Sequence, residues 1–316
     1  MSDTKKIATR DSYGRALLDL ADAGCNDIVV LDADLSVSTK TCLFRDAYPN
    51  RFFECGIAEQ NMMGVAAGLS TFGYVPFASS FAMFASGRAY EQVRNSIGYP
   101  HLNVKIGATH GGLSVGEDGA SHQCCEDFAL MRSIPGMVVL CPADDVEARA
   151  VVRAAYRYKG PVYMRFCRLP VPVFHDELNY HFEIGKGEQL TDGFDLAVIS
   201  TGLMTGEVLK AALKLKKQGV AVRVINMASI KPLDEELVLR AARDCKRVMT
   251  VEEHSVIGGL GEAVCALLSE KLPTPVRRIG VPDQYGHSAP AWEVLGDFGL
   301  DADHLLVAMQ DMIKNS

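Results

Sequence analysis

The sequence predicts an α/β protein made of two successive doubly wound domains. Three observations lead to this prediction: short β-rich runs alternate with helix-like segments, the alternation stops in a proline-rich stretch, and it then restarts. Continuous apolar strands separated by helices indicate a parallel sheet that is covered on both faces. A chain of 316 residues is also too long for one ordinary core and suits two domains of roughly 150 residues each.

In the first half, several runs are rich in β-branched, aromatic and other apolar residues, and we expect each to form a strand. They cover residues 27–35, 51–56, 74–81, 103–109, 137–142 and 161–166. Helix-like patterns cover residues 12–24 and 145–160. We therefore expect a first domain over residues 1–170.

Periodicity is lost between residues 168 and 193, and we interpret residues 171–192 as an interdomain linker because prolines accumulate there. The alternation then resumes in a smaller second domain, residues 193–316. Its expected strands cover residues 195–200, 221–227, 247–253 and 276–282, and its expected helices lie near residues 203–218, 233–245, 258–271 and 301–315. The Gly-Gly turn after Glu252, Glu253 and His254 lacks the GxGxxG pattern, which favours plain strand-to-helix geometry over a phosphate loop.

Composition excludes several classes of protein. Hydrophobic residues make up 48% and charged residues 22% of the chain, an ordinary globular balance. No apolar run approaches the ~18 residues that span a bilayer, and the start lacks a signal-peptide core, so we expect a cytoplasmic protein without membrane contact. A net charge of −7 does not indicate the excess of basic residues that is typical of nucleic-acid-binding proteins. The nine cysteines form no CxxC pair, which favours reduced thiols over disulfides or a zinc site, and we expect no metal ligands.

One loop concentrates proton-carrying side chains. The stretch THGGLSVGEDGASHQ, residues 109–123, holds four glycines together with His110, Asp118 and His122. Glycines let the backbone approach a ligand, and loops after parallel strands are where open α/β sheets bind ligands. The alternative is a surface loop with solvated charges and no function, but the density of proton-carrying side chains favours a functional loop.

Glu59 stands at the expected start of a helix whose other residues look suited to burial. It follows the run FFECG and precedes QNMMGVAAG. An acid in the first turn commonly stabilises the helix dipole, and the residues alone favour that explanation.

Four motifs carry a family resemblance. GIAEQNMMGVAAG, SSFAMFASGRAYEQVRNS, THGGLSVGEDGASHQ and PVYMRFCRLP, in that order and spacing, resemble the pyrimidine-binding domain of transketolases, and the second half resembles the transketolase C-terminal domain. Together the two resemblances cover essentially the whole chain, and GEDGASHQ is the most specific motif. Similar signals occur more loosely in 1-deoxyxylulose-5-phosphate synthases and in beta chains of 2-oxo-acid dehydrogenases.

The resemblance implies a thiamine diphosphate enzyme and a catalytic role for Glu59. The cofactor is activated when a carboxyl group in an apolar pocket shares a proton with its aminopyrimidine ring, and Glu59 matches that acid. Phe81 and Phe84 match the aromatic residues that stack on this ring. Gly87 replaces a third aromatic residue, so the pocket is either looser or filled by Tyr90. Asp34 matches a position near the cofactor and the subunit interface, although a structural turn role is equally open.

The resemblance also assigns substrate contacts. His110 and His122 match the histidines that face the substrate, as proton shuttles or hydrogen-bond donors. Asp118 matches the acid that binds a hydroxyl of the sugar. Three residues match positions that hold the substrate's phosphate, namely Arg10, Ser38 and Arg168. Arg165 lies three residues before Arg168, so which of these two arginines holds the phosphate stays open.

Half of the expected active site is missing. Transketolases bind the diphosphate and its Mg²⁺ through an N-terminal domain marked by a GDG and a later Asn, and this chain has neither that pattern nor a P-loop. The resemblance therefore implies a split enzyme. A partner N-terminal subunit would supply the diphosphate and Mg²⁺ site, and we expect a heterotetramer with two chains of each kind.

We thus expect the C-terminal subunit of a split transketolase, which moves a two-carbon ketol group between sugar phosphates. The alternatives are half of a 1-deoxyxylulose-5-phosphate synthase-like or other specialised sugar-phosphate ketolase, and a 2-oxo-acid dehydrogenase beta chain, a class that lacks the GEDGASHQ loop. A catalytically silent assembly subunit is the non-enzyme alternative, and the retained Glu59, His110, Asp118 and His122 argue against it. The sequence does not identify the donor and acceptor sugars.

Overall fold

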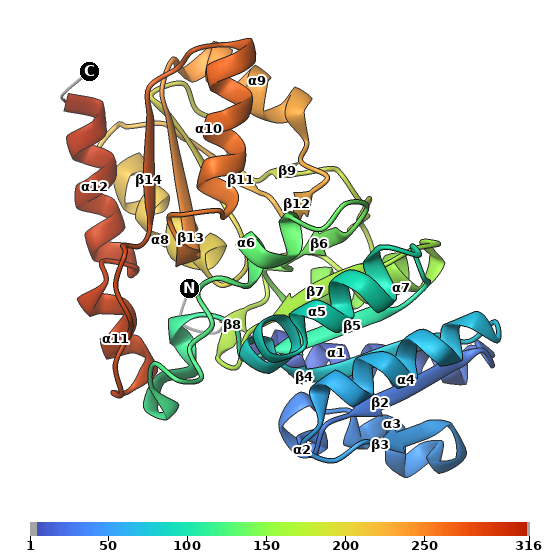
Figure 1. Cartoon of the computed structure of the whole chain (residues 1–316). Helices are drawn as coiled ribbons and strands as arrows, with labels where there is room; N and C mark the ends of the chain where they lie inside the picture. The colour runs from blue at the N-terminus through green and yellow to red at the C-terminus, as the bar shows by residue number, and fades with distance from the viewer. Residues whose placement is uncertain (1–4, 315–316) are drawn as a thin grey trace. The chain divides into compact units, whose positions relative to one another are not determined.

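The computed structural model describes residues 5–314, so the predicted end of the last helix at residue 315 lies outside the described residues. Contacts divide the chain into two compact units. The first comprises Met1–Gly111 and Leu130–Glu183, and the second comprises Gly112–Ala129 and Ile184–Ser316. Each unit is built on a largely parallel sheet with helices, which confirms the predicted α/β fold class (Figure 1). Within residues 5–314, no helix is long and apolar enough to cross a membrane.

The sheet of the first unit runs in the order β6–β7–β5–β4–β2–β3, with parallel neighbours throughout. Its strands are β2 Ile28–Asp32, β3 Phe52–Glu54, β4 Val75–Phe81, β5 Lys105–Thr109, β6 Val138–Leu140 and β7 Val162–Phe166. Each lies inside a run that the sequence predicts as a strand. β1 Lys6–Ala8 and β8 Pro170–Pro172 form a separate antiparallel pair.

Helices cover both faces of this sheet, as two neighbouring residues of β4 demonstrate. The Ser79 hydroxyl lies 2.7 Å from the hydroxyl of Tyr13 in α1 Thr9–Asp22, whereas Ser80 Oγ lies 3.5 Å from a carboxylate oxygen of Glu59 in α4 Glu59–Thr71. Successive side chains of a strand point to opposite faces, so α1 and α4 lie on opposite faces of the sheet. α7 Asp145–Arg157 packs along α1.

Shorter helical segments connect these elements. They are α2 Ser36–Thr39, α3 Cys42–Ala47, α5 Tyr90–Gln92, α6 Asp127–Arg132, the 3₁₀ turns η1 Pro49–Arg51 and η4 Leu113–Asp118, and the π-helical turns η2 Met83–Arg88 and η3 Val93–Gly98. A π-turn holds one residue more than an α-turn and is frequent at functional sites. η2 follows β4 directly and therefore sits at the carboxyl edge of the sheet.

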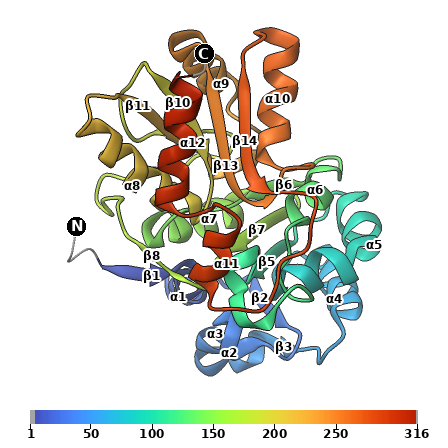
Figure 2. The same cartoon turned by 90° about the vertical axis from the view of Figure 1, so that its left-hand side faces the viewer.

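The sheet of the second unit runs in the order β14–β13–β10–β11–β9, with only β9 antiparallel. Its strands are β9 Glu188–Gln189, β10 Leu196–Ser200, β11 Val222–Asn226, β13 Val248–Ser255 and β14 Val276–Val281, and the short β12 Ser229–Lys231 follows β11. α9 Glu235–Cys245 and α10 Leu260–Lys271 share a core with Ala197 and Ile199 of β10. α8 Met204–Lys216 and α12 Ala302–Lys314 pack together, with α12 toward the viewer in Figure 2. α11 Ala291–Asp297 was not predicted.

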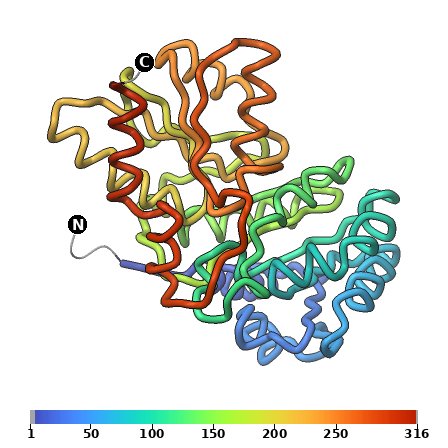
Figure 3. The backbone as a smooth tube through the Cα atoms, turned by 60° about the vertical axis from the view of Figure 1, so that its left-hand side comes forward, coloured from blue at the N-terminus to red at the C-terminus, as the bar shows by residue number. Residues whose placement is uncertain are grey.

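Residues 112–129 lie in the first half of the sequence but pack with the second unit. The backbone N–H of Ser114 donates to the carboxylate of Glu253, and Gln123 Nε2 donates to the carbonyl of His287 at 2.9 Å. η4 in this segment packs against α11, and Figure 3 shows the green segment beside the orange-red chain that leads into α11. Most of the glycine-rich loop therefore takes its shape from the second unit.

A candidate active site at the carboxyl edge of the first sheet

Neighbouring strands of the first sheet end beside the predicted site residues. β4 ends at Phe81, β5 ends just before His110, and β7 ends two residues before Arg168. The three strands are adjacent in the order β7–β5–β4 and parallel, so their carboxyl ends share one edge. Open α/β sheets bind ligands at that edge.

Glu59 is a buried carboxylate at this edge. It is the first residue of α4 and only 1% exposed. Its Oε1 accepts a hydrogen bond from Ser80 Oγ at 3.5 Å, and its Oε2 pairs with Nη1 of Arg88 at 2.8 Å. Arg88 comes from η2 and was missed by the sequence reasoning, since a single arginine in a helical motif ordinarily faces solvent. A buried carboxylate needs such a partner because desolvation disfavours its charge.

Two phenylalanine rings are linked to this carboxylate through Arg88. Phe81 and Phe84 stack at a centroid distance of 5.9 Å and an interplanar angle of 17°. The guanidinium of Arg88 lies 4.7 Å from the centroid of the Phe84 ring. The other side of the cluster is His110, whose ring stacks on Phe81 at 3.9 Å. The structure thus brings the predicted acid, both predicted aromatic residues and one predicted histidine into one chain of contacts.

The side chain of Met83 lies beside Gly87, which stands at the position of the third family aromatic. A Cβ added to Gly87 would lie 2.4 Å from Cε of Met83, so Met83 occupies the space beside Gly87. The hydroxyl of Tyr90 bonds instead to Ser133 Oγ at 2.9 Å.

The predicted phosphate residues also lie together. Nη1 of Arg10 lies 2.9 Å from Nε2 of His110 and donates to the backbone carbonyl of Ser38 at 3.3 Å. Burial lowers the pKa of Arg10, and the charge of Arg168 acts in the same direction, which places these two cations near each other. Arg165, the other arginine considered for the phosphate, is buried. It is 4% exposed, and a Cβ added to Gly111 would lie 2.0 Å from its Nε.

The two carboxylates of the LDADLS stretch differ in burial: Asp32 is buried, and Asp34 is exposed. Asp34 is exposed with φ of 62°, and its backbone N–H donates to Glu54 at 2.7 Å. Asp32 accepts hydrogen bonds from the Leu35 N–H and from the Thr39 and Thr41 hydroxyls, all within 2.7–2.8 Å. Burial raises the pKa of Asp32 to about 6 despite these bonds. The two threonines tie the segment around Ser38 to the end of β2 through Asp32.

Asp118 and His122 belong to the second unit. Asp118 is the exposed last residue of η4. The His122 backbone N–H donates to the Gly119 carbonyl at 3.0 Å, and its Nδ1 lies 2.9 Å from Ser121 Oγ. The predicted site residues therefore fall into two groups, and these two are carried by the segment that packs with the second unit.

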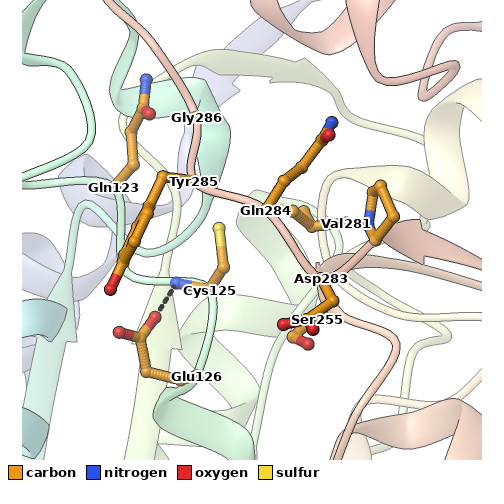
Figure 4. A pocket seen from close by; sticks show the side chains of 10 residues that line it. Gln123, Cys125, Glu126, Ser255, Val281, Asp283, Gln284, Tyr285 and Gly286 are labelled. Carbon is orange, nitrogen blue, oxygen red and sulfur yellow. Dashed lines mark hydrogen bonds between the residues drawn. The ribbon is translucent and has the colours of Figure 1, made fainter.

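A hollow of about 280 Å³ lies in the second unit next to this segment. Residues 281–286 line it together with Gln123, Cys125, Glu126 and Ser255. In Figure 4 the side chain of Cys125 points toward the space between Tyr285 and Gln284. The lining contains carboxylates but neither lysine nor arginine, so the hollow does not suit a phosphate. No group of three or more His, Cys, Asp or Glu side chains that could hold a metal ion occurs within residues 5–314.

Comparisons with known proteins match this architecture. The family model for the transketolase pyrimidine-binding domain matches residues 5–173, and that for the transketolase C-terminal domain matches residues 185–305. A Methanocaldococcus jannaschii protein with the provisional name transketolase C-terminal section is 49% identical over 96% of both chains. The 6-deoxy-6-sulfo-D-fructose transketolase subunit of a Clostridium species is 41% identical over 96% of this chain and 94% of its own. A split-gene transketolase solved as an inactive beta4 tetramer is 52% identical, with a TM-score of 0.90 over 98% of this chain and 99% of that one.

Proposed function

Because the chain belongs to the transketolase family, we propose that it is the C-terminal subunit of a split transketolase. The proposed reaction transfers a two-carbon ketol group from a ketose to an aldose in the cytoplasm, and thiamine diphosphate is the proposed cofactor. When bound, this cofactor supplies the electron sink that such a transfer requires. The residues of the chain bind and orient the cofactor and transfer protons near it.

The residues at the carboxyl edge fit the aminopyrimidine half of this cofactor. The test is whether one planar group can contact both the acid and an aromatic face. The Arg88 guanidinium does so, at 2.8 Å from Glu59 and 4.7 Å from the Phe84 ring centroid. This is the observation that carries the proposal, since a flat heterocycle with a hydrogen-bonding nitrogen needs the same two partners.

Each remaining residue has a distinct proposed role. Glu59 shares a proton with the aminopyrimidine, and Phe81 and Phe84 orient that ring. His110 and His122 hold and move protons at the sugar oxygens. Asp118 accepts a hydrogen bond from a sugar hydroxyl. The anionic end of the sugar is held by the two guanidinium groups of Arg10 and Arg168, here called the cationic cluster, together with Ser38.

A partner chain is needed for the rest of the cofactor. The sequence has no GDG pattern for the diphosphate and Mg²⁺, while relatives of equal length are named as a section or a subunit. We propose an N-terminal subunit that holds these groups and an assembly of two chains of each kind. One relative is described as an inactive beta4 tetramer, which agrees with a chain that needs its partner for activity.

The substrate class follows from the cationic cluster. One relative is named for a sugar that carries a sulfonate in place of a phosphate, and guanidinium groups bind both anions. The donor assay should therefore compare fructose 6-phosphate with 6-deoxy-6-sulfofructose. The neutral sugar fructose serves as the matched control for the anionic end.

The experiment that tests the proposal is a pull-down from native extract, followed by reconstitution. We expect a second chain with the GDG and Asn pattern in equal amount, and ketol transfer only from the pair with thiamine diphosphate and Mg²⁺. Ketol transfer by this chain alone would contradict the split. A homo-oligomer without a second chain, and a pair without transfer activity, would each contradict the assignment as a transketolase subunit.

A further inference from the structure

Arg88 occupies the two surfaces that the proposed cofactor ring needs. Its Nη1 donates to Glu59 Oε2 at 2.8 Å, and its guanidinium covers the Phe84 ring at 4.7 Å. We propose that Arg88 is a gate: it stands in for the aminopyrimidine in the chain without cofactor and leaves Glu59 when the cofactor binds. This inference rests on the proposed function and adds to it a residue that controls access to the acid.

The π-turn η2 creates this geometry. Phe84 and Arg88 both lie in Met83–Arg88, and a π-turn places residues four and five apart close together along the same side. A Cβ added to Gly87 would lie 2.4 Å from Met83 Cε, so the terminal methyl of Met83 lies directly beside Gly87. The extra residue in the turn thus directs the arginine, instead of a third aromatic ring, at the acid.

Chemistry requires that the contact be broken. Glu59 must hydrogen-bond an uncharged ring nitrogen in the proposed reaction, whereas its Oε2 already accepts a hydrogen bond from Nη1 of Arg88 at 2.8 Å. The two partners also compete for space, because one face of Phe84 and one carboxylate oxygen accept a single planar group. Arg88 therefore cannot stay in this position while the ring is bound.

The exposure of the two partners shows which one moves. The Arg88 side chain is 47% exposed, while Glu59 is 1% exposed at the start of a helix. Arg88 can swing into water without crossing protein, whereas Glu59 is held by α4. In the chain without cofactor, the arginine also gives the buried carboxylate a charged partner. A buried carboxylate without such a partner would be strongly destabilising.

The test measures binding of 4-amino-5-hydroxymethyl-2-methylpyrimidine to the full chain by isothermal titration calorimetry. This probe has the ring of the cofactor and no phosphate, so no partner subunit is needed. We expect Arg88→Met to bind it with a Kd at least tenfold lower than the wild type does. Arg94→Met is the matched control, because Arg94 is exposed and bonds to Asn95, and its Kd should equal that of the wild type. Equal or weaker binding by Arg88→Met, or no saturable binding, would overturn the gate.

Two further readouts separate the gate from a merely structural role. In the reconstituted pair, Arg88→Met should reach half-maximal activity at a lower concentration of thiamine diphosphate than the wild type does; an equal concentration would overturn the gate. The double variant Glu59→Gln, Arg88→Met tests the proposed function itself. If it binds the probe as well as Arg88→Met does, the ring is not on Glu59 and the proposed function fails. If Glu59→Gln abolishes binding but Arg88→Met does not improve it, the gate alone fails.

Discussion

Arg10 and His110 form a direct contact, with Nη1 of the arginine 2.9 Å from Nε2 of the histidine. A guanidinium only donates hydrogen bonds, so Nε2 must accept and the ring proton must lie on Nδ1. Nδ1 is 2.8 Å from Thr109 Oγ1, which can accept that proton. The residue proposed to hold an anion therefore also sets the tautomer of the residue proposed to handle protons.

Arg10→Leu should weaken both roles. Loss of a hydrogen bond to a charged group costs about 1.5–3 kcal/mol, which corresponds to a KM for the anionic sugar roughly 10- to 150-fold higher. The pH profile of kcat should also change, because His110 is then free to take either tautomer. Steady-state kinetics of the reconstituted pair measure both quantities. Arg15→Leu, at an exposed position of α1, is the control, and an unchanged KM in Arg10→Leu would contradict the role of Arg10.

Glu59→Gln should abolish turnover without preventing assembly. Glutamine keeps the size of the side chain but cannot share a proton as a carboxyl group does, and loss of such a group lowers kcat by about 10²- to 10⁴-fold. Size-exclusion chromatography of the pair measures assembly, and a ketol-transfer assay measures kcat. Glu91→Gln changes an exposed acid of α5 and should leave kcat unaltered. Full activity in Glu59→Gln would remove Glu59 from the active site.

Gly116→Ala should destabilise the second unit. Gly116 has φ of 75° and ψ of −114°, and an added Cβ would lie 3.1 Å from Cα of Ala291. The strained backbone costs about 1–3 kcal/mol, and crowding against α11 adds to it. Gly24→Ala has φ of 90° with nothing within 4 Å of its Cβ, so its loss of unfolding free energy should be smaller. Equal losses in urea denaturation would show that contact with Ala291 has no effect.

Lys105 should make stability depend on pH. Its side chain is fully buried, its Nζ donates to the carbonyls of Tyr158 and Gly160, and burial lowers its pKa to about 7. The unfolded value is about 10.4, so between pH 7 and 10 the unfolded chain holds a proton that the folded chain has released. Stability should therefore rise with pH in that window, by up to about 1.4 kcal/mol per pH unit.

The measurement for Lys105 is urea denaturation at pH 7, 8 and 9. The wild type should gain stability relative to Lys105→Met as pH rises, whereas Lys217→Met, at an exposed position, should follow the wild type. Parallel curves for the wild type and Lys105→Met would contradict the lowered pKa.

Strands of the first sheet could be predicted because each is a continuous apolar run bounded by polar residues, a purely local signal. The position of residues 112–129 could not, because it depends on distant partners such as Glu253 and His287. The same distinction holds at the site. Glu59 could be found from its motif, but its partner Arg88 is set by a π-turn that no local pattern marks. The match of Asp34 to a family position stays a prediction, and the burial that distinguishes Asp32 from Asp34 is not visible in the sequence.

The packing of residues 112–129 with the second unit limits how the chain can be divided. A cut anywhere in residues 171–192 would leave this segment on the first fragment, where the Ser114 N–H and the Gln123 amide would lose their acceptors Glu253 and His287. Neither fragment would then be a self-contained folding module. The boundary between the sequence halves is therefore a poor site for truncation or for fusion of foreign domains, and deletion mapping across it would misassign functions to both halves.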